Sequence, residues 1–327
     1  MIPTLLGISL ACFLLIQFVP GGPVEDMMAR VKAHSSDRGA GDRTRISQEE
    51  LAHIRAYYGF DQSIPVQYIR WLGKVVKLDL GISYTYRKPV WDLIVDKMPV
   101  SLFFGLTSFI ISYLVCIPLG VLKAVKNGSA FDALSSALIF AGYVIPGYAL
   151  GILLITFFAG GQYLDLFPLS GLSSDDFEEF TLLGKILDVL YHGTLPLICF
   201  MASEFAFLTL LTKNSLLDEL HKDYLRTARL KGASFMQAVF KHALRNALVP
   251  LATRSAELFT LMFTSALLIE RVFDIDGMGL LFYNSIVGRD YNVVMGLIVL
   301  SSAFALLGRL FADFLLVVVD PRIQLDK

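Results

Sequence analysis

Charged side chains are scarce in this 327-residue chain. Asp, Glu, Lys and Arg together make up 17% of it, whereas soluble domains average about 25%. The formal net charge is −1, so the chain lacks the basic excess typical of nucleic-acid-binding proteins. Only three cysteines occur, each inside an apolar run, which excludes a disulfide scaffold and a cysteine-rich metal site. The phosphate-binding pattern G-x-x-x-x-G-K-[ST] is absent, so no nucleotide-binding motif is present.

Apolar residues are abundant, at 55% of the chain, and they gather in long runs. A helix of about 20 mostly apolar residues can cross a bilayer. Helices are expected because open backbone cannot face lipid. The sequence therefore predicts an all-α integral membrane protein with six transmembrane helices, at residues 2–19, 99–122, 134–159, 194–212, 247–268 and 293–319.

The distribution of Lys and Arg predicts how the chain is oriented. Seven of them lie in 213–246, whereas the segment between the third and fourth runs has only Lys185 against six acidic residues. Since cytoplasmic loops are enriched in Lys and Arg, 213–246 is expected in the cytoplasm, and both chain ends with it. The first run lacks the basic start and the cleavage site of a signal peptide, so we expect it to be retained.

This orientation divides the chain into three parts. They are a first transmembrane helix (1–19), an external helical segment (20–98) and a five-helix membrane core (99–327) that carries 213–246. In the external segment, a capping box predicts a helix over 47–58, and apolar spacing predicts another over 66–76. These helices suit either a structural cap on the bundle or a docking surface for an external partner.

The basic segment 213–246 predicts a short helix, a stop and a second helix. Gly232 suits the left-handed residue that ends a helix, and Ser234 with Gln237 forms a capping box for the next one. A short helix with small Ala228 between cationic side chains suits insertion into a groove of a partner. Alternatively, the cations only follow the charge rule and bind anionic lipid headgroups.

This segment resembles the EAA motif of permease subunits in binding-protein-dependent ABC importers, with Ala228, Gly232 and Pro250 at its Ala, Gly and closing Pro positions. The chain is similar to the dipeptide/oligopeptide permease family over nearly its whole length, at residues 2–7, 20–23, 58–61, 79–81, 223–231, 242–247, 289–291 and 320–322. Within that family it most resembles the Yej-type B subunits, which are linked to oligopeptide and microcin C uptake, at residues 123–129, 158–161 and 211–215.

The resemblance implies a type I ABC importer permease fold in a bacterial inner membrane. It also implies three protein partners: a second, related permease subunit, ABC ATPase subunits and a periplasmic peptide-binding protein. ATP and Mg would bind to the ATPase subunits, and no cofactor to this chain. The substrates would be oligopeptides or microcin C-like peptides. The ATPase-coupling residues carried over are Asp223, Tyr224, Arg226, Thr227, Ala228, Arg229, Lys231 and Gly232.

Three charged residues at membrane depth are candidates for a translocation pathway: Glu204, Arg254 and Glu257. A charge at the centre of a membrane helix costs about 2.5–3.5 kcal/mol, so each needs a partner or water. Arg254 and Glu257, three residues apart, can pair, while Glu204 either meets Arg254 or lines an aqueous cavity. Such groups either hold helices together or offer a carboxylate to the amino terminus of a peptide.

Prolines and glycines interrupt several runs. Pro118 and Pro146 predict kinks, as packing geometry or as a gating hinge. The glycines of 271–279 predict a tight re-entrant turn after the fifth run.

Three other classes of membrane protein were weighed. An ion-coupled secondary transporter of small solutes predicts internal repeats, and none is evident. An intramembrane enzyme needs a catalytic or metal-binding constellation at depth, yet no histidine lies mid-membrane, and a channel needs a selectivity filter that the sequence does not show.

Overall fold

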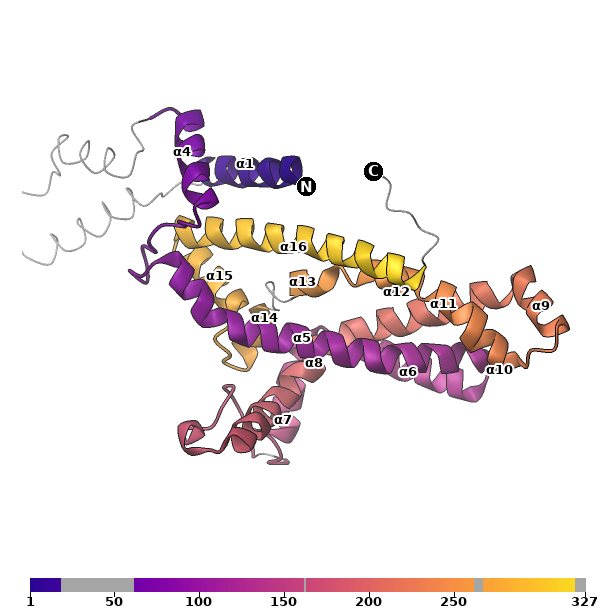
Figure 1. Ribbon diagram of the computed structural model, residues 1–327. Coiled ribbons are helices and arrows are strands. Elements are labelled where there is room, and N and C mark those ends of the chain that lie inside the picture. The colour runs from indigo at the N-terminus through magenta and orange to yellow at the C-terminus, as the bar shows by residue number, and fades with distance from the viewer. Residues whose placement is uncertain (19–61, 162, 262–266, 321–327) are drawn as a thin grey trace, which may run out of the picture. The chain divides into compact units, whose positions relative to one another are not determined.

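The computed structural model describes residues 1–18, 62–161, 163–261 and 267–320 (Figure 1). The helix predicted over 47–58 lies outside these residues. Within them the chain is helical and no strand forms, apart from an isolated bridge between Ile82 and Pro89. The all-α prediction is therefore confirmed. The described residues fall into two compact units, which share the long helices α5 (Val90–Val125) and α16 (Tyr291–Val319).

The first unit contains α1 (Ile2–Phe18) and α4 (Ile64–Val76), close to the runs predicted over 2–19 and 66–76. α4 begins at the extended residue Ser63 and has a proline in its first turn, as helix starts favour. The two helices meet through Phe13, whose ring lies 5.5 Å from that of Tyr68 and 5.8 Å from that of Trp71. The α4 prediction is confirmed as secondary structure, and its partner is the first helix.

The second unit is built along the long helix α8 (Leu182–Leu220), beside which α6 (Ala130–Val144) and α7 (Gly147–Phe158) pack. Its remaining elements are the single turn η1 (Phe177–Glu179), α9 (Asp223–Leu230), α10 (Phe235–Ala238), the π-turn η2 (Val239–Ala243), α11 (Leu244–Ala247), α12 (Val249–Arg254), α13 (Glu257–Leu261), α14 (Leu267–Val272) and the start of α15 (Met278–Val287).

A buried polar hub joins three of these helices. Lys123 of α5 is fully buried and lies 3.1 Å from a carboxylate oxygen of Asp132 on α6, and Lys213 of α8 lies 2.7 Å from the other oxygen. Lys123 also donates to the hydroxyls of Ser135 and Ser136. The hub ties the ends of α5, α6 and α8 together, because each buried cation has its partner on a neighbouring helix.

Three helices of the described part are long and apolar enough to cross a membrane: Val90–Val125, Leu182–Ala202 within α8, and Tyr291–Val319. α6 and α7 together make a fourth if they count as one span. The predicted count of six transmembrane helices is therefore not fully confirmed: the first predicted run forms a shorter apolar helix, and the third and fifth runs are interrupted.

The third predicted run breaks at Pro146, where α6 and α7 meet at 99°. Ile145 is extended, as a residue before proline prefers, and proline offers no N–H to continue the helix. α7 also approaches α8 closely, since a Cβ on Gly147 would lie 3.1 Å from the carbonyl oxygen of Cys199. The kink predicted at Pro146 is thus a sharp turn of the chain.

The fifth predicted run is also discontinuous, divided among α11, α12, α13 and α14. A glycine after it lies against a buried carboxylate: a Cβ on Gly277 would come within 2.4 Å of Glu270 Oε1. Glu270 accepts hydrogen bonds from the backbone N–H groups of Gly279 and Leu280, at 3.4 and 2.6 Å, and so caps the start of α15. The turn predicted over 271–279 joins α14 to α15.

Candidate functional site

The basic segment is a folded structure carried by the end of α8. The helix runs to Leu220, so the loop predicted to begin at residue 213 starts inside it, and this boundary is corrected. α9 follows after two residues and ends before Gly232, whose φ of +94° matches the predicted stop. The capping box of Ser234 and Gln237 is present, as predicted. The predicted second helix contains the π-turn η2, a feature frequent at functional sites.

One side of α9 packs on an apolar cluster. Leu225 is buried there with Leu216 of α8, and small residues of the following helices complete the cluster: Ala238, Val239, Ala243 and Ala247. Burial of these side chains holds α9 against its neighbours, because removing apolar surface from water stabilises by about 25 cal/mol per Å².

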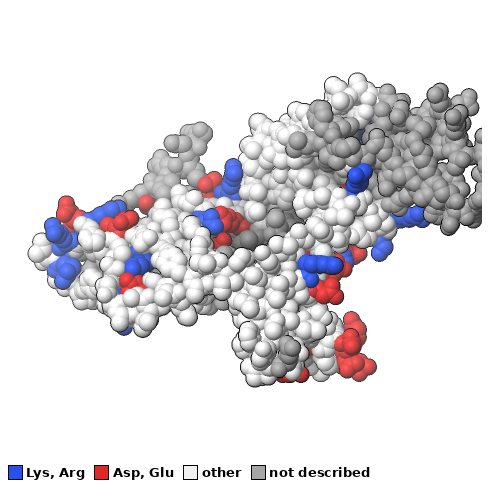
Figure 2. All heavy atoms as spheres, turned by 180° about the vertical axis from the view of Figure 1, so that it is seen from behind, with Lys and Arg blue, Asp and Glu red and all other residues white. Residues whose placement is uncertain are grey.

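The other side of α9 is open and cationic. The Arg226 side chain is 81% exposed and lies 3.9 Å from Asp223, and Leu230 is 89% exposed at the end of the helix. Arg229 and Lys231 are exposed beside it. Figure 2 shows Lys and Arg, with some Asp and Glu among them, at the end of the second unit that carries α9 and α10. The helix thus presents positive charge and an unburied leucine on a rigid support.

The eight predicted coupling residues do not all share this open face. Tyr224 is half-buried, and its hydroxyl donates to Glu219 Oε2 at 2.5 Å. Thr227 donates to the carbonyl oxygen of Asp223 within the helix, and the carbonyl oxygen of Ala228 accepts from the backbone N–H of Ala233. The exposed members are Asp223, Arg226, Thr227, Arg229, Lys231 and Gly232, while Ala228 is partly buried.

A second site is a pocket within the same unit, whose empty space, together with the solvent at its mouth, is about 480 Å³. It is lined by Gly105, Ser108, Phe109, Ser112, Tyr113, Phe200, Glu204, Leu208, Arg254 and Glu257. α5 and α8 supply most of these residues, and the broken fifth run supplies the last two. All three charged residues predicted for a translocation pathway therefore meet at one place.

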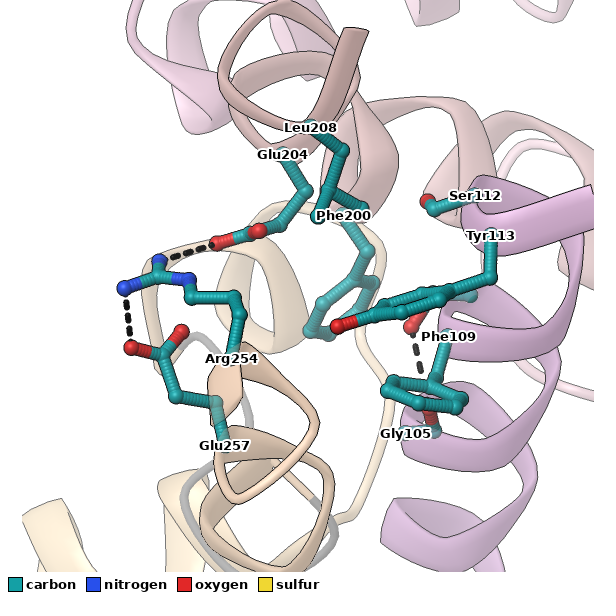
Figure 3. A pocket seen from close by; sticks show the side chains of 10 residues that line it. Gly105, Phe109, Ser112, Tyr113, Phe200, Glu204, Leu208, Arg254 and Glu257 are labelled. Carbon is teal, nitrogen blue, oxygen red and sulfur yellow. Dashed lines mark hydrogen bonds and ion pairs between the residues drawn. The ribbon is translucent and has the colours of Figure 1, made fainter. Parts of the chain in front are cut away.

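Arg254 stands between the two carboxylates (Figure 3). One guanidinium nitrogen lies 3.3 Å from Glu204 Oε1, and another pairs with Glu257. The guanidinium also lies over the ring of Phe207, with 4.4 Å from its carbon to the ring centroid. Glu204 was expected either to pair with Arg254 or to line a cavity. In the structure it pairs with Arg254 and also lines the pocket. The cluster carries one excess negative charge, since two carboxylates face one guanidinium.

Aromatic rings form the opposite wall of the pocket. Tyr113 and Phe109 stack with their ring centroids 4.2 Å apart, and the Tyr113 hydroxyl donates to the carbonyl oxygen of Leu251 at 3.0 Å. The buried Ser112 Oγ has no hydrogen-bond partner. The sequence reasoning missed this wall, because Tyr113 lies in an apolar run where an aromatic residue is unremarkable. The pocket therefore sets an aromatic wall opposite a charged one.

The described residues contain no group of three or more His, Cys, Asp or Glu side chains placed to hold a metal ion.

Comparison with known proteins identifies the family. The family described as binding-protein-dependent transport system inner membrane component matches residues 116–325. The chain belongs to this family. The matched range includes the basic segment and all three charged residues of the pocket, whereas the aromatic wall of the pocket, with Phe109 and Tyr113, lies before it.

Individual relatives match over the whole chain. The chain is 40% identical to the peptidoglycan transport system permease protein YejB of Agrobacterium fabrum, covering 100% of this chain and 96% of the relative. It is 41% identical to the inner membrane ABC transporter permease protein YejB of Escherichia coli O157:H7 (99% and 96%). Identity to the dipeptide transport system permease protein DppB of Escherichia coli K12 is 34% (100% and 96%). These findings confirm the resemblance and do not support an ion-coupled secondary transporter.

Proposed function

We propose that this chain is a membrane-spanning permease subunit of an ATP-driven importer that carries peptides from an external binding protein into the bacterial cytoplasm. Relatives named as peptidoglycan and dipeptide transport permeases support the substrate class. Oligopeptides and microcin C-like peptides are the substrates that we expect. The chain would pair with a second, related permease subunit, and both its termini would lie in the cytoplasm.

The observation that carries the proposal is α9. It is a short cationic helix held rigidly on the apolar cluster under Leu225, with its outer face free for a partner. Since the chain contains no phosphate-binding loop, separate ATPase subunits would bind ATP and Mg. Arg226, Arg229 and Lys231 would contact those subunits. ATP binding can then shift the permease between two conformations only if the ATPase subunits favour one of them.

The pocket is proposed as part of the translocation pathway. Glu204 and Glu257 would offer carboxylates to the ammonium group of a peptide, and the rings of Phe109 and Tyr113 would contact its apolar parts. The excess negative charge of the cluster favours a cationic group over an anionic one. Arg254 limits the strength of that attraction because it already pairs with both carboxylates.

The test is co-purification followed by reconstitution. We expect the tagged chain to bring a second permease and ATPase subunits from its native membrane, and the complex to take up oligoalanine peptides with ATP. Gly232→Val should uncouple transport from ATP hydrolysis, because a β-branched residue resists the positive φ of this position. Gly142→Val is the matched control, since a Cβ there meets nothing within 4 Å. Retained peptide-stimulated ATPase activity and uptake in Gly232→Val would refute the role of α9.

A further inference from the structure

Glu219 of α8 is a buried carboxylate that the translocation pathway does not use. The residue is 8% exposed and lies in the last turn of α8, beyond the membrane-spanning part of that helix. Its Oε1 accepts from Lys222 Nζ at 2.5 Å, and its Oε2 accepts from the hydroxyl of Tyr224 at 2.5 Å and from Asn246 Nδ2 at 3.4 Å. Three chain segments thus converge on one side chain.

The contacts form a closed triangle. Tyr224 stands in the first turn of α9 and donates to Glu219, while its hydroxyl accepts from Asn246 Nδ2 at 3.2 Å. Asn246, on α11, therefore contacts both of the other residues. Each helix that meets here has a hydrogen bond to the other two. The bond from Tyr224 to Glu219 is short and has a charged acceptor, which roughly doubles its strength, whereas the two bonds from Asn246 are longer, at 3.2 and 3.4 Å.

The triangle lies where movement of α9 must pass into the rest of the chain. α9 is joined to α8 only by His221 and Lys222, and to the helices that follow by the stretch 231–234 around Gly232. The apolar cluster under Leu225 resists separation of these helices, but such contacts are not directional. Hydrogen bonds are directional, so the triangle fixes the angle of α9 about its contact.

We propose that Glu219, Tyr224 and Asn246 form a clamp that locks α9 at once to α8 and to α11, so that displacement of α9 by a partner moves both helices together. This α9 clamp rests on the proposed function and adds to it the residues that transmit the movement. Its members are positioning residues, since Tyr224 and Glu219 point away from the open cationic face. α8 and the helices after α11 carry Glu204 and Arg254, so the clamp connects α9 with both sides of the ion pair in the pocket.

The clamp is tested in the complete complex of this chain with its permease and ATPase partners, reconstituted in proteoliposomes with its binding protein and oligoalanine peptides. The variants are Tyr224→Phe and Asn246→Ala, which remove hydrogen bonds without placing a new charge. Tyr163→Phe is the matched control, because that tyrosine is 65% exposed on the loop after α7. The readouts are the rate of ATP hydrolysis and the number of peptides taken up per ATP.

We expect peptide uptake per ATP to fall roughly tenfold or more in Tyr224→Phe, which loses the short bond to a charged acceptor, and by less in Asn246→Ala, which loses two longer bonds, while hydrolysis continues in both. The double variant should be no worse than the more severe single one, because the residues act as one unit. Tyr163→Phe should match the wild type.

Unchanged uptake per ATP in both variants would overturn the clamp, even if less complex assembles, because a merely structural role alters the amount of complex and leaves the ratio intact. Absence of ATP-driven uptake by the wild type would instead count against the proposed function. Hydrogen exchange of the α9 amides then decides the clamp separately: faster exchange over Asp223–Leu230 in Tyr224→Phe supports it, and unchanged exchange overturns it.

Discussion

Replacing Gly277 with alanine should destabilise the turn between α14 and α15. A Cβ at this position would lie 2.4 Å from Oε1 and 2.7 Å from Cδ of Glu270, far inside van der Waals contact. Glu270 is 1% exposed, so its carboxylate is enclosed by protein atoms and must shift within the packed interior. The clash therefore moves the carboxylate away from the two N–H groups that it caps.

The cost follows from the bonds that are lost. The bond from the N–H of Leu280 is short, at 2.6 Å, whereas that from Gly279 is long, at 3.4 Å, so we count one full bond. A hydrogen bond to a charged group contributes about 1.5–3 kcal/mol. We therefore expect Gly277→Ala to lower the free energy of unfolding by about 1.5–3 kcal/mol.

The assay is reversible unfolding of the purified chain in mixed micelles, followed by circular dichroism. Gly142→Ala is the control, because a Cβ there meets nothing and alanine favours a helix by roughly 0.5–1 kcal/mol over glycine. If Gly277→Ala is as stable as Gly142→Ala, the hydrogen bonds from the N–H groups of Gly279 and Leu280 do not hold the Glu270 carboxylate in place, and the reasoning is wrong.

Three further predictions concern other charged groups. Asp132→Asn should destabilise the chain by about 3–5 kcal/mol, because Lys123 stays buried without its counter-charge; equal unfolding midpoints in micelles would contradict this. Burial opposes ionisation of Glu219, but hydrogen bonds from Lys222, Tyr224 and Asn246 hold the pKa of its carboxyl below the ordinary 4.5. Since the folded pKa is the lower one, Glu219 contributes stability above pH 4.5 that is lost as the pH falls through the folded pKa, and in an unfolding series against pH this loss should be missing in Glu219→Gln. Glu204→Gln should reduce uptake of peptides with a free amino terminus more than uptake of amino-acetylated ones, and equal uptake of both would remove Glu204 from the pathway.

Local signals predicted the details of the basic segment well. Gly232 and the capping box of Ser234 and Gln237 are set by residues within a few positions of one another, and the structure contains all of them. The helices of 2–19 and 66–76 followed from composition and spacing in the same way.

Features that depend on contacts between residues far apart in the chain could not be predicted from the sequence. The clamp joins Glu219 to Asn246, 27 positions away, and no spacing rule connects them. The fifth run is apolar enough to suggest one span, yet it is divided among short helices. Apolar composition predicts that a segment enters the membrane, whereas the packing of neighbouring helices decides whether the segment crosses it without a break.

In the proposed function, the charged cluster of the pocket would attract a peptide without retaining it. Two carboxylates facing open space would hold an ammonium group strongly, but here Arg254 pairs with both of them. An arriving cation must compete with this guanidinium for the carboxylates. Its binding free energy is therefore only the difference between the ion pair that it forms and the ion pair that it replaces. Glu204 lies on α8, and Arg254 lies on α12, which follows α11, so the proposed α9 clamp acts on α8 and on the helix before Arg254. A small displacement between these helices would therefore change the competition, and with it the attraction of the pocket for its substrate.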